Sequence, residues 1–406
     1  MVKAAVLGYG TVGSGVVEVL RTNRSSIARR AGDEIEVAYV LDIREFPGDP
    51  VEEILVHDYD VILEDPEVLI VAETMGGLHP AYEFTKRALE SGRHVCTSNK
   101  ELVAEHGTEL MRIAKEHGVN YFFEASCGGG IPVIRALYGS LTADVIDEVS
   151  GILNGTTNYI LSKMAEEGSD FADVLAEAQR IGYAERDPSA DVDGHDARRK
   201  IAILSSLAYG QYVSYADIPT EGIAQVSATD IRYAKELGAA VKLLAVSRRT
   251  ETGCFVMVCP AMIRPDSPLY AVNGVFNAVF VHGNMLGDAM FYGSGAGKLP
   301  TASAVAADIV ACAMHRGEHL DIEWSEEKLE LLPAGETEDR FFVRIEGSAA
   351  ERLPEVREAF GDVDVVEVPG LEGEFGIVTG KLKEADYLAR EAALTGVHGR
   401  FIRVFF

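Results

Sequence analysis

Residues 2–13, VKAAVLGYGTVG, decide the fold of the first part of the chain. The first six of them predict a buried strand, and the run from Thr11 to Leu20 has the spacing of a helix that follows directly. Between these elements, Gly8, Gly10 and Gly13 form the pattern GxGxxG. In this context the glycines allow a tight turn, close approach of a pyrophosphate and close helix–strand packing, while the helix N-terminus attracts phosphates. The stretch predicts a dinucleotide site rather than a glycine-rich turn without a ligand. The candidate cofactor contacts here are Gly8, Gly10, Thr11, Val12 and Gly13.

Short apolar runs recur along the first 130 residues and alternate with segments of helical spacing. Strands are predicted at Ala4–Leu7, Glu36–Leu41, Val68–Ala72, His94–Thr97 and Asn120–Phe123. This alternation is typical of βαβ units around a parallel sheet. Together with the glycine pattern, it predicts a Rossmann-type nucleotide-binding domain over residues 1–130, completed by a helix at 300–317.

Residues 131–299 mix longer strands with helices and predict an α+β domain for substrate binding, catalysis and dimerisation. The expected strands are Val145–Leu153, Cys254–Met262 and Ala278–Val281, and the expected helices are Phe171–Ile181 and Asp196–Tyr209. The acidic stretch 318–339 holds the only tryptophan and has the character of a linker.

The last segment, residues 340–406, predicts a small C-terminal domain. Its expected elements are strand Phe341–Ile345, helix Glu351–Phe360, strands Val363–Val368 and Gly376–Thr379, helix Lys383–Leu394 and strand Phe401–Phe406. The order βαββαβ is that of a ferredoxin-like fold. The fold class is therefore α/β, with three domains in the chain.

The composition excludes several classes of partner. The chain of 406 residues carries a formal net charge of −27, so no basic stripe is available for nucleic acid or for an anionic membrane surface. The five cysteines are scattered without a CxxC pair, which argues against a disulfide framework or a zinc site. No apolar stretch approaches the roughly 20 residues of a membrane helix, and no signal peptide is recognisable. A cytoplasmic protein that acts on a small molecule is expected.

Two residues at the end of the second predicted strand bear on the choice of cofactor. Asp42 favours NAD, because a carboxylate there accepts the ribose 2′-hydroxyl. Arg44 favours NADP, because an arginine there accommodates the 2′-phosphate. Both residues are present, so the sequence leaves NAD and NADP open.

Lys100 follows the fourth predicted strand, within Thr97-Ser98-Asn99-Lys100-Glu101. Ser98 and Glu101 have the spacing of a capping box, which predicts a helix start here. Lys100 then lies in the first turn, where the helix dipole disfavours a cation. That position suits a lysine that faces the nicotinamide and the substrate better than a structural one. The alternative is a solvated surface lysine.

A glycine run at residues 124–132, EASCGGGIP, ends the fifth predicted strand. Exposed carbonyl groups together with the carboxylate of Glu124 have the chemistry that coordinates a hard monovalent or divalent cation. The residues alone favour the alternative of a hinge between domains.

The densest polar stretch of the chain, residues 183–196, leads into a helix that carries Lys200. Asp196 and Lys200 are four residues apart and share one helix face in the favourable order of acid before base. Lys200 also shares a face with Leu204 and Leu207, and a partly desolvated lysine suits proton exchange with a carbonyl oxygen. The acidic residues do not have the spacing of a calcium loop. An exposed, capped helix with one ion pair is the alternative.

Asn154-Gly155 is expected to form a polar turn after the predicted strand and before a helix capped by threonine. The run Asn-Gly-Thr also matches a glycosylation sequon, which has no meaning in a cytoplasmic protein.

These segments, in this order, resemble the homoserine dehydrogenase family. The matching segments are GYGTVG at 8–13, SNKELVA at 98–104, EASCGGGIPVI at 124–134, GILNGTTNYIL at 151–161, AQRIGYAERDPSADVDGHDARRK at 178–200 and GAGKLPTASAVAADI at 295–309. The resemblance covers about residues 1–317, and the segment 178–200 is its most specific part. It implies reduction of L-aspartate 4-semialdehyde to L-homoserine with NADPH or NADH, by a homodimer or homotetramer.

The resemblance also implies roles for individual residues. Lys200 would be the proton donor to the aldehyde oxygen, and Lys100 would be a second essential lysine. Substrate contacts would come from Glu185, Asp196, Asp191 and Gly182, and further cofactor contacts from Thr74, Lys100 and Gly297. Sodium would be bound by Glu124 with the carbonyl groups of Cys127, Gly129 and Ile131.

The C-terminal segment resembles an ACT regulatory domain in layout only. The Asp-x-Pro-Gly turn usual after the first strand is replaced by Ile345-Glu346-Gly347-Ser348-Ala349, so weak or absent inhibition by threonine is expected. A chain ending near residue 330 is expected to stay active, because every candidate catalytic residue lies before residue 300. Two rival functions are another Rossmann oxidoreductase, such as an aspartate dehydrogenase, and a sensor of nucleotide and amino acid without turnover. The first would not need the Glu185, Asp196 and Lys200 cluster, and the second would be expected to lose a lysine.

Overall fold

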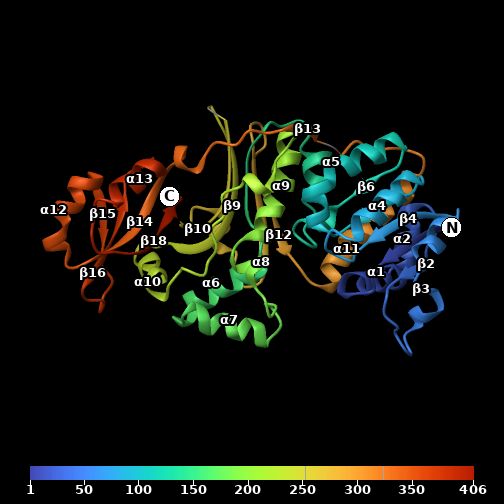
Figure 1. Ribbon diagram of the computed structural model, residues 1–406, viewed down its shortest axis with the longest axis horizontal. Helices are drawn as coiled ribbons and strands as arrows, with labels where there is room; N and C mark the ends of the chain where they lie inside the picture. Colours follow the sequence, from blue (N-terminus) through green and yellow to red (C-terminus); the bar gives the residue numbers. More distant parts are fainter. Residues whose placement is uncertain (252, 323) are drawn as a thin grey trace. The chain divides into compact units, whose positions relative to one another are not determined.

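A computed structural model describes residues 1–251, 253–322 and 324–406 (Figure 1). Its contacts divide the chain into two compact units, each built from three segments. Unit 1 comprises Met1–Val145, Ala202–Tyr215 and Phe291–Leu329, and unit 2 comprises Ile146–Ile201, Ala216–Met290 and Glu330–Phe406.

Unit 1 is built on a parallel sheet that has six strands within the described ranges, in the order β3-β2-β1-β4-β5-β6. The strands are β1 (Val2–Leu7), β2 (Ile35–Leu41), β3 (Leu55–Val56), β4 (Val68–Glu73), β5 (His94–Thr97) and β6 (Tyr121–Phe122). This is the strand order of doubly wound nucleotide-binding folds, whose ligands bind where the order reverses, between β1 and β4. The predicted Rossmann-type sheet is confirmed. Strand β3 was not predicted, because a strand of two residues is too short to show an alternation of apolar and polar residues.

Helices connect these strands and include one from much later in the chain. They are α1 (Thr11–Thr22), α2 (Arg24–Ala31), α3 (Tyr59–Glu64), α4 (Ala81–Glu90), α5 (Lys100–Glu116) and α11 (Lys298–Met314). Helix α11 packs against α1 and contacts β4 and β5. A Cβ on Gly15 would lie 2.8 Å from the Cβ of Ala302, so a glycine is needed where α1 and α11 touch.

The acidic stretch predicted as a linker packs in part onto unit 1. Strand β13 (Ser325–Lys328) pairs in parallel with β8 (Gln211–Tyr212). Trp324 is buried, its indole Nε1 donates to Oγ1 of Thr108 at 2.7 Å, and its ring meets Phe123 edge-on. Trp324 therefore fastens this stretch to α5.

Unit 2 contains a larger mixed sheet, ten-stranded over the described residues, in the order β12-β11-β7-β9-β10-β18-β14-β16-β15, with β17 paired to β14. Its strands are β7 (Ile146–Ile152), β9 (Ala240–Thr250), β10 (Gly253–Ile263), β11 (Phe276–Gly283), β12 (Gly287–Ser294), β14 (Glu338–Glu346), β15 (Val363–Val366), β16 (Glu374–Thr379), β17 (Leu382–Lys383) and β18 (Val397–Val404). The helices that follow or connect them are α6 (Gly155–Glu167), α7 (Phe171–Arg180), α8 (Ser189–Val192), α9 (His195–Tyr209), α10 (Ala228–Glu236), α12 (Ala349–Phe360) and α13 (Glu384–Glu391). The last four residues of β12 and the second half of α9 belong to unit 1.

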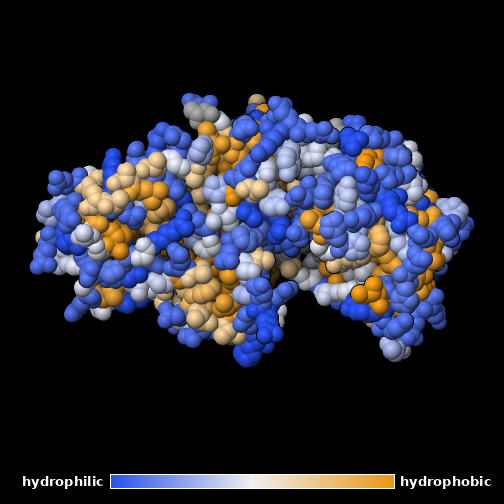
Figure 2. All heavy atoms as spheres, viewed as in Figure 1, coloured by the Kyte–Doolittle hydropathy of each residue, from blue (hydrophilic) through white to orange (hydrophobic). Residues whose placement is uncertain are grey.

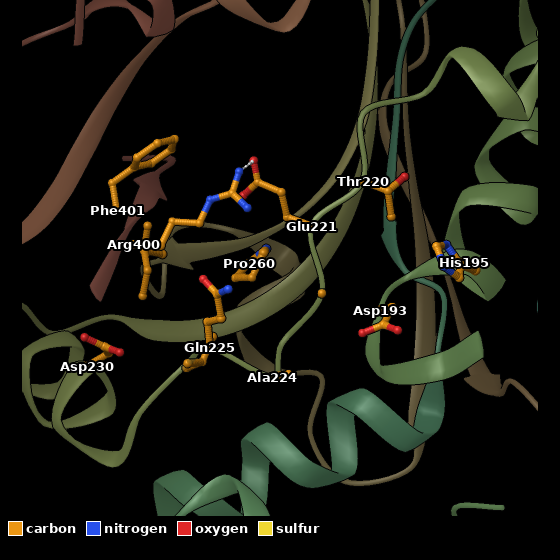
Figure 3. Close-up of a pocket in the computed structure, with 13 residues that line it drawn as sticks. Asp193, His195, Thr220, Glu221, Ala224, Gln225, Asp230, Pro260, Arg400 and Phe401 are labelled. Atoms are coloured by element: carbon orange, nitrogen blue, oxygen red, sulfur yellow. Dashed lines mark ion pairs between the residues drawn. The ribbon is translucent and has the colours of Figure 1, made fainter. Parts of the chain in front are cut away.

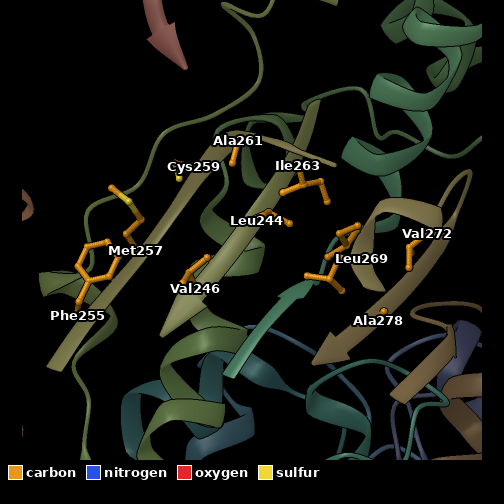
Figure 4. Packing of buried hydrophobic residues seen from close by; sticks show 11 residues of the cluster. Leu244, Val246, Phe255, Met257, Cys259, Ala261, Ile263, Leu269, Val272 and Ala278 are labelled. Atoms are coloured by element: carbon orange, nitrogen blue, oxygen red, sulfur yellow. The ribbon is translucent and has the colours of Figure 1, made fainter. Parts of the chain in front are cut away.

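The core of unit 2 lies on the long hairpin of β9 and β10 (Figure 4). Val246 of β9 and Met257 and Ala261 of β10 belong to one buried apolar cluster. Residues of β7, β11 and the 3₁₀ turn Pro268–Ala271 also belong to this cluster. Both faces of β9 and β10 are buried, so neither strand shows the alternation of a half-exposed strand.

The C-terminal elements β14, α12, β15, β16, α13 and β18 follow the predicted order βαββαβ. Their strands pair antiparallel with the fourth, first, third and second strand side by side, as in ferredoxin-like folds. Strand β18 also pairs in parallel with β10, with Ala261 opposite Arg403. The segment thus shares one sheet with the rest of unit 2, which changes the result expected of truncation near residue 330.

The surface agrees with the acidic composition. Hydrophilic residues cover most of the face seen in Figure 2, as the net charge of −27 predicts. The five cysteines are buried. In the three described ranges no helix combines the length and the apolar character that crossing a membrane requires.

Candidate active site

The glycine-rich turn after β1 has the geometry that its three glycines predict. Gly8 has a φ of +90°, and a Cβ on Gly13 would lie 1.8 Å from the carbonyl oxygen of Gly8. A Cβ on Gly10 would meet nothing within 4 Å, so the space beside this residue is open. Gly10 is also the N-cap of α1, whose first amide groups face outward from the sheet edge. The turn therefore leaves room for a phosphate at a helix N-terminus.

Thr74 holds this turn from the neighbouring strand. It follows β4, and its hydroxyl lies 2.9 Å from the carbonyl oxygens of both Leu7 and Gly8. Its backbone N–H also donates to the carbonyl of Leu7 at 2.9 Å. In this structure the side chain of Thr74 supports the backbone that would cradle the pyrophosphate.

Asp42 and Arg44 form a close ion pair at the end of β2. The Asp42 carboxylate accepts from Nε and Nη2 of Arg44 at 2.9 and 2.8 Å, from the Arg44 backbone N–H at 3.0 Å and from the Tyr9 N–H at 2.7 Å. The Arg44 guanidinium lowers the pKa of Asp42 to about 2, against the opposing effect of burial. Asp42 is buried, whereas 56% of the Arg44 side chain is exposed. The two residues that pointed to different cofactors are thus one structural unit.

Lys100 lies in the first turn of α5, as predicted, and it is the first residue of that helix, but the cap that precedes it differs from the prediction. The N-cap is Asn99, whose side-chain oxygen accepts from the Leu102 N–H at 3.1 Å. The predicted capping box of Ser98 and Glu101 is wrong, because the helix begins one residue later than that box requires. The Asn99 amide also donates to the carbonyl of Gly77 at 2.6 Å. Asn99 thereby fixes the backbone of Lys100 at the carboxyl edge of the parallel sheet, which is also the edge of the glycine-rich turn.

Glu124 is buried, and its carboxylate already has protein partners. Its two oxygens accept from the backbone N–H groups of Ile134 at 3.0 Å and Arg135 at 2.8 Å. The Glu124 N–H donates to Asp308, which pairs with Arg135. Burial raises the pKa of Asp308 to about 7; Arg135 opposes this rise and Glu124 adds to it. The Glu124 carboxylate therefore holds the backbone of the following loop at Ile134 and Arg135.

The glycines after Glu124 bring two distant segments of unit 1 together. A Cβ on Gly129, which has a φ of +55°, would lie 2.5 Å from the carbonyl oxygen of Gly295. Gly297 has a φ of +122° and is the N-cap of α11. Ile131 is buried, and its carbonyl accepts from the Val133 N–H at 2.9 Å. Cys127 is buried in the same loop, and no group of three or more His, Cys, Asp or Glu side chains suited to a metal occurs in the described part of the chain.

One buried polar cluster of unit 2 is centred on Lys200. Its Nζ donates to Oδ2 of Asp196 at 2.6 Å and to the carbonyl of Leu153 at 2.7 Å. The amide of Asn154 donates to the same Asp196 oxygen at 2.9 Å and to Oδ1 of Asp191 at 2.7 Å. Lys200 and Asp196 are 8% and 5% exposed, so the alternative of an exposed helix with one ion pair does not hold.

Asn154 is the residue of this cluster that sequence reasoning missed. It is the N-cap of α6, and its side-chain oxygen accepts from the Thr157 N–H at 2.9 Å, so the predicted threonine cap is wrong. Its amide group joins two acids that follow 37 and 42 residues later. Its place between a buried strand and a helix start was the one available signal, and that signal indicates a cap.

Gly182 and Glu185 lie on an exposed turn after α7. Gly182 has a φ of +82°, and the turn is held by Gln179, whose amide donates to the carbonyls of Glu185 at 3.0 Å and Arg186 at 3.3 Å. The carbonyl of Tyr183 accepts from the Thr156 hydroxyl at 2.8 Å, which links the turn to the first turn of α6. Glu185 is exposed, in contrast to the buried Asp196.

Comparison with known proteins gives a consistent picture across the chain. Residues 8–124 match the family model described as homoserine dehydrogenase, NAD binding domain, and residues 132–310 match the model described as homoserine dehydrogenase. A homoserine dehydrogenase of Neisseria gonorrhoeae is 42% identical over 365 residues, which cover 85% of this chain and 82% of that protein.

Solved structures show the same likeness. The crystal structure of a homoserine dehydrogenase from Thiobacillus denitrificans has a TM-score of 0.90 at 37% identity, and the match covers 100% of this chain and 98% of that one. A hyperthermophilic archaeal homoserine dehydrogenase in complex with NADPH has a TM-score of 0.67 at 30% identity, and the match covers 77% of this chain and 98% of that one.

Proposed function

The chain belongs to the homoserine dehydrogenase family, and from that premise we propose which of its residues carry out the reaction. It is an oxidoreductase with a nicotinamide cofactor, and it interconverts L-aspartate 4-semialdehyde and L-homoserine. The bound nicotinamide supplies or accepts the hydride at the carbon that bears the substrate oxygen. The observation that carries the residue assignment is the buried pair of Lys200 and Asp196 with Asn154 beside it.

Lys200 is the general acid of the reductive direction. As the aldehyde carbon is reduced, negative charge develops on the aldehyde oxygen, and the Lys200 ammonium donates a proton to it. Asp196 and the carbonyl of Leu153 hold Nζ, at 2.6 and 2.7 Å, so that the ammonium is oriented before substrate arrives. In the oxidative direction the neutral amine of Lys200 takes the hydroxyl proton of homoserine.

Acidic residues of the same segment recognise the substrate amino group. Asp191 shares the Asn154 amide with Asp196, which supports a contact between Asp191 and an ammonium close to Lys200. Glu185 and Gly182 lie on the turn attached to α6, where an exposed carboxylate is available to an incoming substrate. Lys100 is a second essential lysine, and its place at the carboxyl edge of the parallel sheet supports that role.

NADP is the preferred cofactor. The four donors from Tyr9 and Arg44 fill the roughly four acceptor sites of the Asp42 carboxylate, which leaves little capacity for a ribose hydroxyl. Arg44 uses only part of its guanidinium on Asp42 and is half exposed, so it is suited to a 2′-phosphate. Gly8, Gly10 and Gly13 provide the pyrophosphate turn. The NADPH bound to the archaeal relative supports this preference.

A sodium ion would be bound in the loop after Glu124 mainly by backbone carbonyl groups. Each oxygen of the Glu124 carboxylate already accepts one amide N–H, so the side chain could offer an ion only its remaining acceptor capacity. The carbonyls of Cys127 and Gly129 are the candidates that remain, and the ion would hold the loop in shape without entering the chemistry. A higher thermal midpoint in sodium chloride than in choline chloride at equal ionic strength would support this ion.

The roles of the chain's domains and its oligomeric state are further parts of the proposal. We assign residues 1–130 with helix 300–317 to cofactor binding, 131–299 to substrate binding and dimerisation, and 340–406 to a regulatory module. Of the segment 318–339, the part up to Leu329 belongs to unit 1, which leaves 330–339 as the linker. A homodimer or homotetramer in the cytoplasm is expected, which sedimentation and cell fractionation would test.

The direct test is oxidation of L-homoserine followed by the absorbance of the reduced nicotinamide. The assay is run with NADP and with NAD separately, and with L-aspartate in place of homoserine. Turnover of homoserine but not of aspartate, with a lower KM for NADP, is the expected result. Turnover of aspartate, or tight binding of both ligands without turnover, would replace the proposal by one of the rival functions.

A further inference from the structure

Arg403, near the end of the chain, is fully buried between two carboxylates of unit 2. Its Nη1 donates to Oε2 of Glu221 at 2.9 Å, and its Nη2 donates to Oε2 of Glu384 at 2.5 Å. The other oxygen of Glu221 lies 2.7 Å from Nη2 of Arg400, as the dashed line in Figure 3 marks. Arg403 has no exposed surface, and the side chain of Glu221 is 10% exposed. Both oxygens of Glu221 are therefore tied to the last strand, β18.

The loop that carries Glu221 is pinned to β10 by its backbone. The Glu221 N–H donates to the carbonyl of Val258 at 2.8 Å, and the Val258 N–H donates to the carbonyl of Pro219 at 3.0 Å. A cavity of about 350 Å³ lies beside this loop, and Asp193, Glu221 and Arg400 are among the residues that line it (Figure 3). The Glu221 side chain borders this cavity, and both of its carboxylate oxygens are held by ion pairs with β18.

Gly222, the residue after Glu221, is in close contact with the segment that leads to α9, the helix that carries Lys200. A Cβ on Gly222 would lie 2.3 Å from the carbonyl oxygen of Val192 and 2.6 Å from the Cα of Asp193. The Ile223 N–H donates to the same Val192 carbonyl at 2.8 Å. The two backbones are thus in direct contact, and no side chain fits between them. A movement of the loop must move Val192 and Asp193.

That segment presents the acids of the proposed active site. Asp191 directly precedes Val192, and Asp196, the partner of Lys200, follows Asp193 by three residues. Gly194, with a φ of +82°, would bring a Cβ to 3.0 Å from Cγ2 of Thr220, so the turn between α8 and α9 also rests on the loop. A shift of this turn displaces the carboxylates that orient the Lys200 ammonium.

We propose that Glu221 and Arg403 are positioning residues for the dehydrogenase reaction. Through this ion pair, the C-terminal strand holds the loop 219–223 against the turn 191–196, and the loop sets the geometry of Asp191 and Asp196. The inference rests on the proposed role of Lys200. It makes the C-terminal module part of the structure that prepares the acid–base pair, in addition to any regulatory role.

Two variants test, by different means, whether the loop 219–223 sets the geometry of the turn 191–196. Glu221→Gln keeps the size of the side chain but removes its charge, and Gly222→Ala keeps the charge but inserts a methyl group against Val192. Both are expected to lower kcat/KM for homoserine by about tenfold or more, because catalysis is sensitive to misplacement of about 1 Å. KM for NADP should stay unchanged, because the dinucleotide candidates belong to unit 1.

Matched controls separate positioning from general destabilisation. Gly380→Ala adds a Cβ that would meet nothing within 4 Å, and Arg400→Gln removes the half-exposed arm of the ion-pair network. Gly380→Ala should leave kcat/KM for homoserine unchanged. Arg400→Gln should lower it only slightly, since exposed ion pairs contribute little. All variants are assayed well below their thermal midpoints, and the pH profile of kcat/KM is recorded. A displaced profile in Glu221→Gln, partly restored in Glu221→Asp, is expected, because the environment of Lys200 changes.

The outcomes are distinct. Wild-type kcat/KM and an unchanged pH profile in folded Glu221→Gln and Gly222→Ala would overturn the inference, provided that Lys200→Met is inactive. Loss of activity that follows the thermal midpoint alone would overturn it too. Full activity of Lys200→Met would instead overturn the proposed role of Lys200, on which the inference rests. Where Glu221→Gln fails to fold, Gly222→Ala decides.

Discussion

The Nζ of Lys200 lies 2.6 Å from Oδ2 of Asp196, one helical turn earlier on α9, and both side chains are buried. If this ammonium exchanges the proton of the substrate oxygen, Lys200→Met removes the proton donor, and it also removes the partner of the buried Asp196 carboxylate. We expect kcat for homoserine oxidation to fall by about 100-fold or more, the scale of general acid catalysis. KM for the dinucleotide should change little in steady-state assays.

Lys163→Met is the matched control for Lys200→Met. Lys163 lies on α6 of the same unit and pairs with Glu167 and Glu177, both at 2.9 Å. Its loss should leave turnover unchanged. Near-wild-type turnover in Lys200→Met would remove the proposed proton donor.

Arg44→Ala should separate the two cofactors. The substitution removes the donors proposed for the 2′-phosphate and leaves Asp42 with the backbone amides that it also accepts from. KM for NADP should rise by about tenfold or more, which corresponds to one charge-assisted hydrogen bond. KM for NAD should stay the same or fall, because Asp42 regains capacity for a ribose hydroxyl. Equal losses with NAD and NADP would show that Arg44 only holds the turn.

His94 should make the fold sensitive to mild acid. The residue is buried on β5, its Nδ1 accepts the Asn120 backbone N–H at 3.0 Å, and burial lowers the pKa of the ring from 6.5 to about 4. Between these values the unfolded chain binds a proton that the folded chain does not, so the free energy of unfolding decreases as the pH falls from 6.5 to 4. Above pH 6.5 the effect is absent. The total loss is about 3 kcal/mol.

Denaturation by urea at several pH values measures this loss. His94→Gln keeps an acceptor for the Asn120 amide but does not titrate, so its stability should depend less on pH over the same window. Identical pH dependence in the variant and the wild type would assign the acid sensitivity to other groups.

A chain that ends at residue 330 should be less stable and less active than the full chain, contrary to the expectation from sequence. The truncation removes β18, exposes the edge of β10 and leaves Glu221 without Arg403. A lower thermal midpoint and a lower kcat/KM for homoserine are expected, by thermal shift and kinetics. A truncated enzyme with full stability and turnover would restore the earlier expectation.

The sequence predicted those features that depend on local pattern. The strands of unit 1 and the turn of Gly8, Gly10 and Gly13 were recognisable because a parallel sheet repeats the same strand–helix alternation. Strand β9 and strand β12 were not predicted. Ala240–Thr250 is buried on both faces over most of its length and lacks alternation, and Gly287–Ser294 contains two glycines and few branched residues.

Within the site, the sequence predicted the pair of Asp196 and Lys200, but it did not predict the contacts of Asn154 beside that pair. Asp196 and Lys200 share a helix face whatever the tertiary structure. The contacts of Asn154 with Asp191 and Asp196 depend on how α6 and α9 come together, which no local pattern encodes. The same limit explains the cap of α5, since Ser98 and Asn99 are both good N-caps and the contact of Asn99 with Gly77 favours the second.

The position of Trp324 provides an optical probe of one half of the molecule. It is the only tryptophan of the chain, and it lies buried in unit 1 against Phe123 and the helix that begins with Lys100. Its fluorescence emission therefore reports the environment of a single indole, and a red shift during unfolding marks the moment when water reaches that ring. The tyrosines are spread over both units, so their circular dichroism follows the whole chain. Comparing the two signals along one denaturation curve would tell whether the nucleotide-binding half melts together with the rest or on its own.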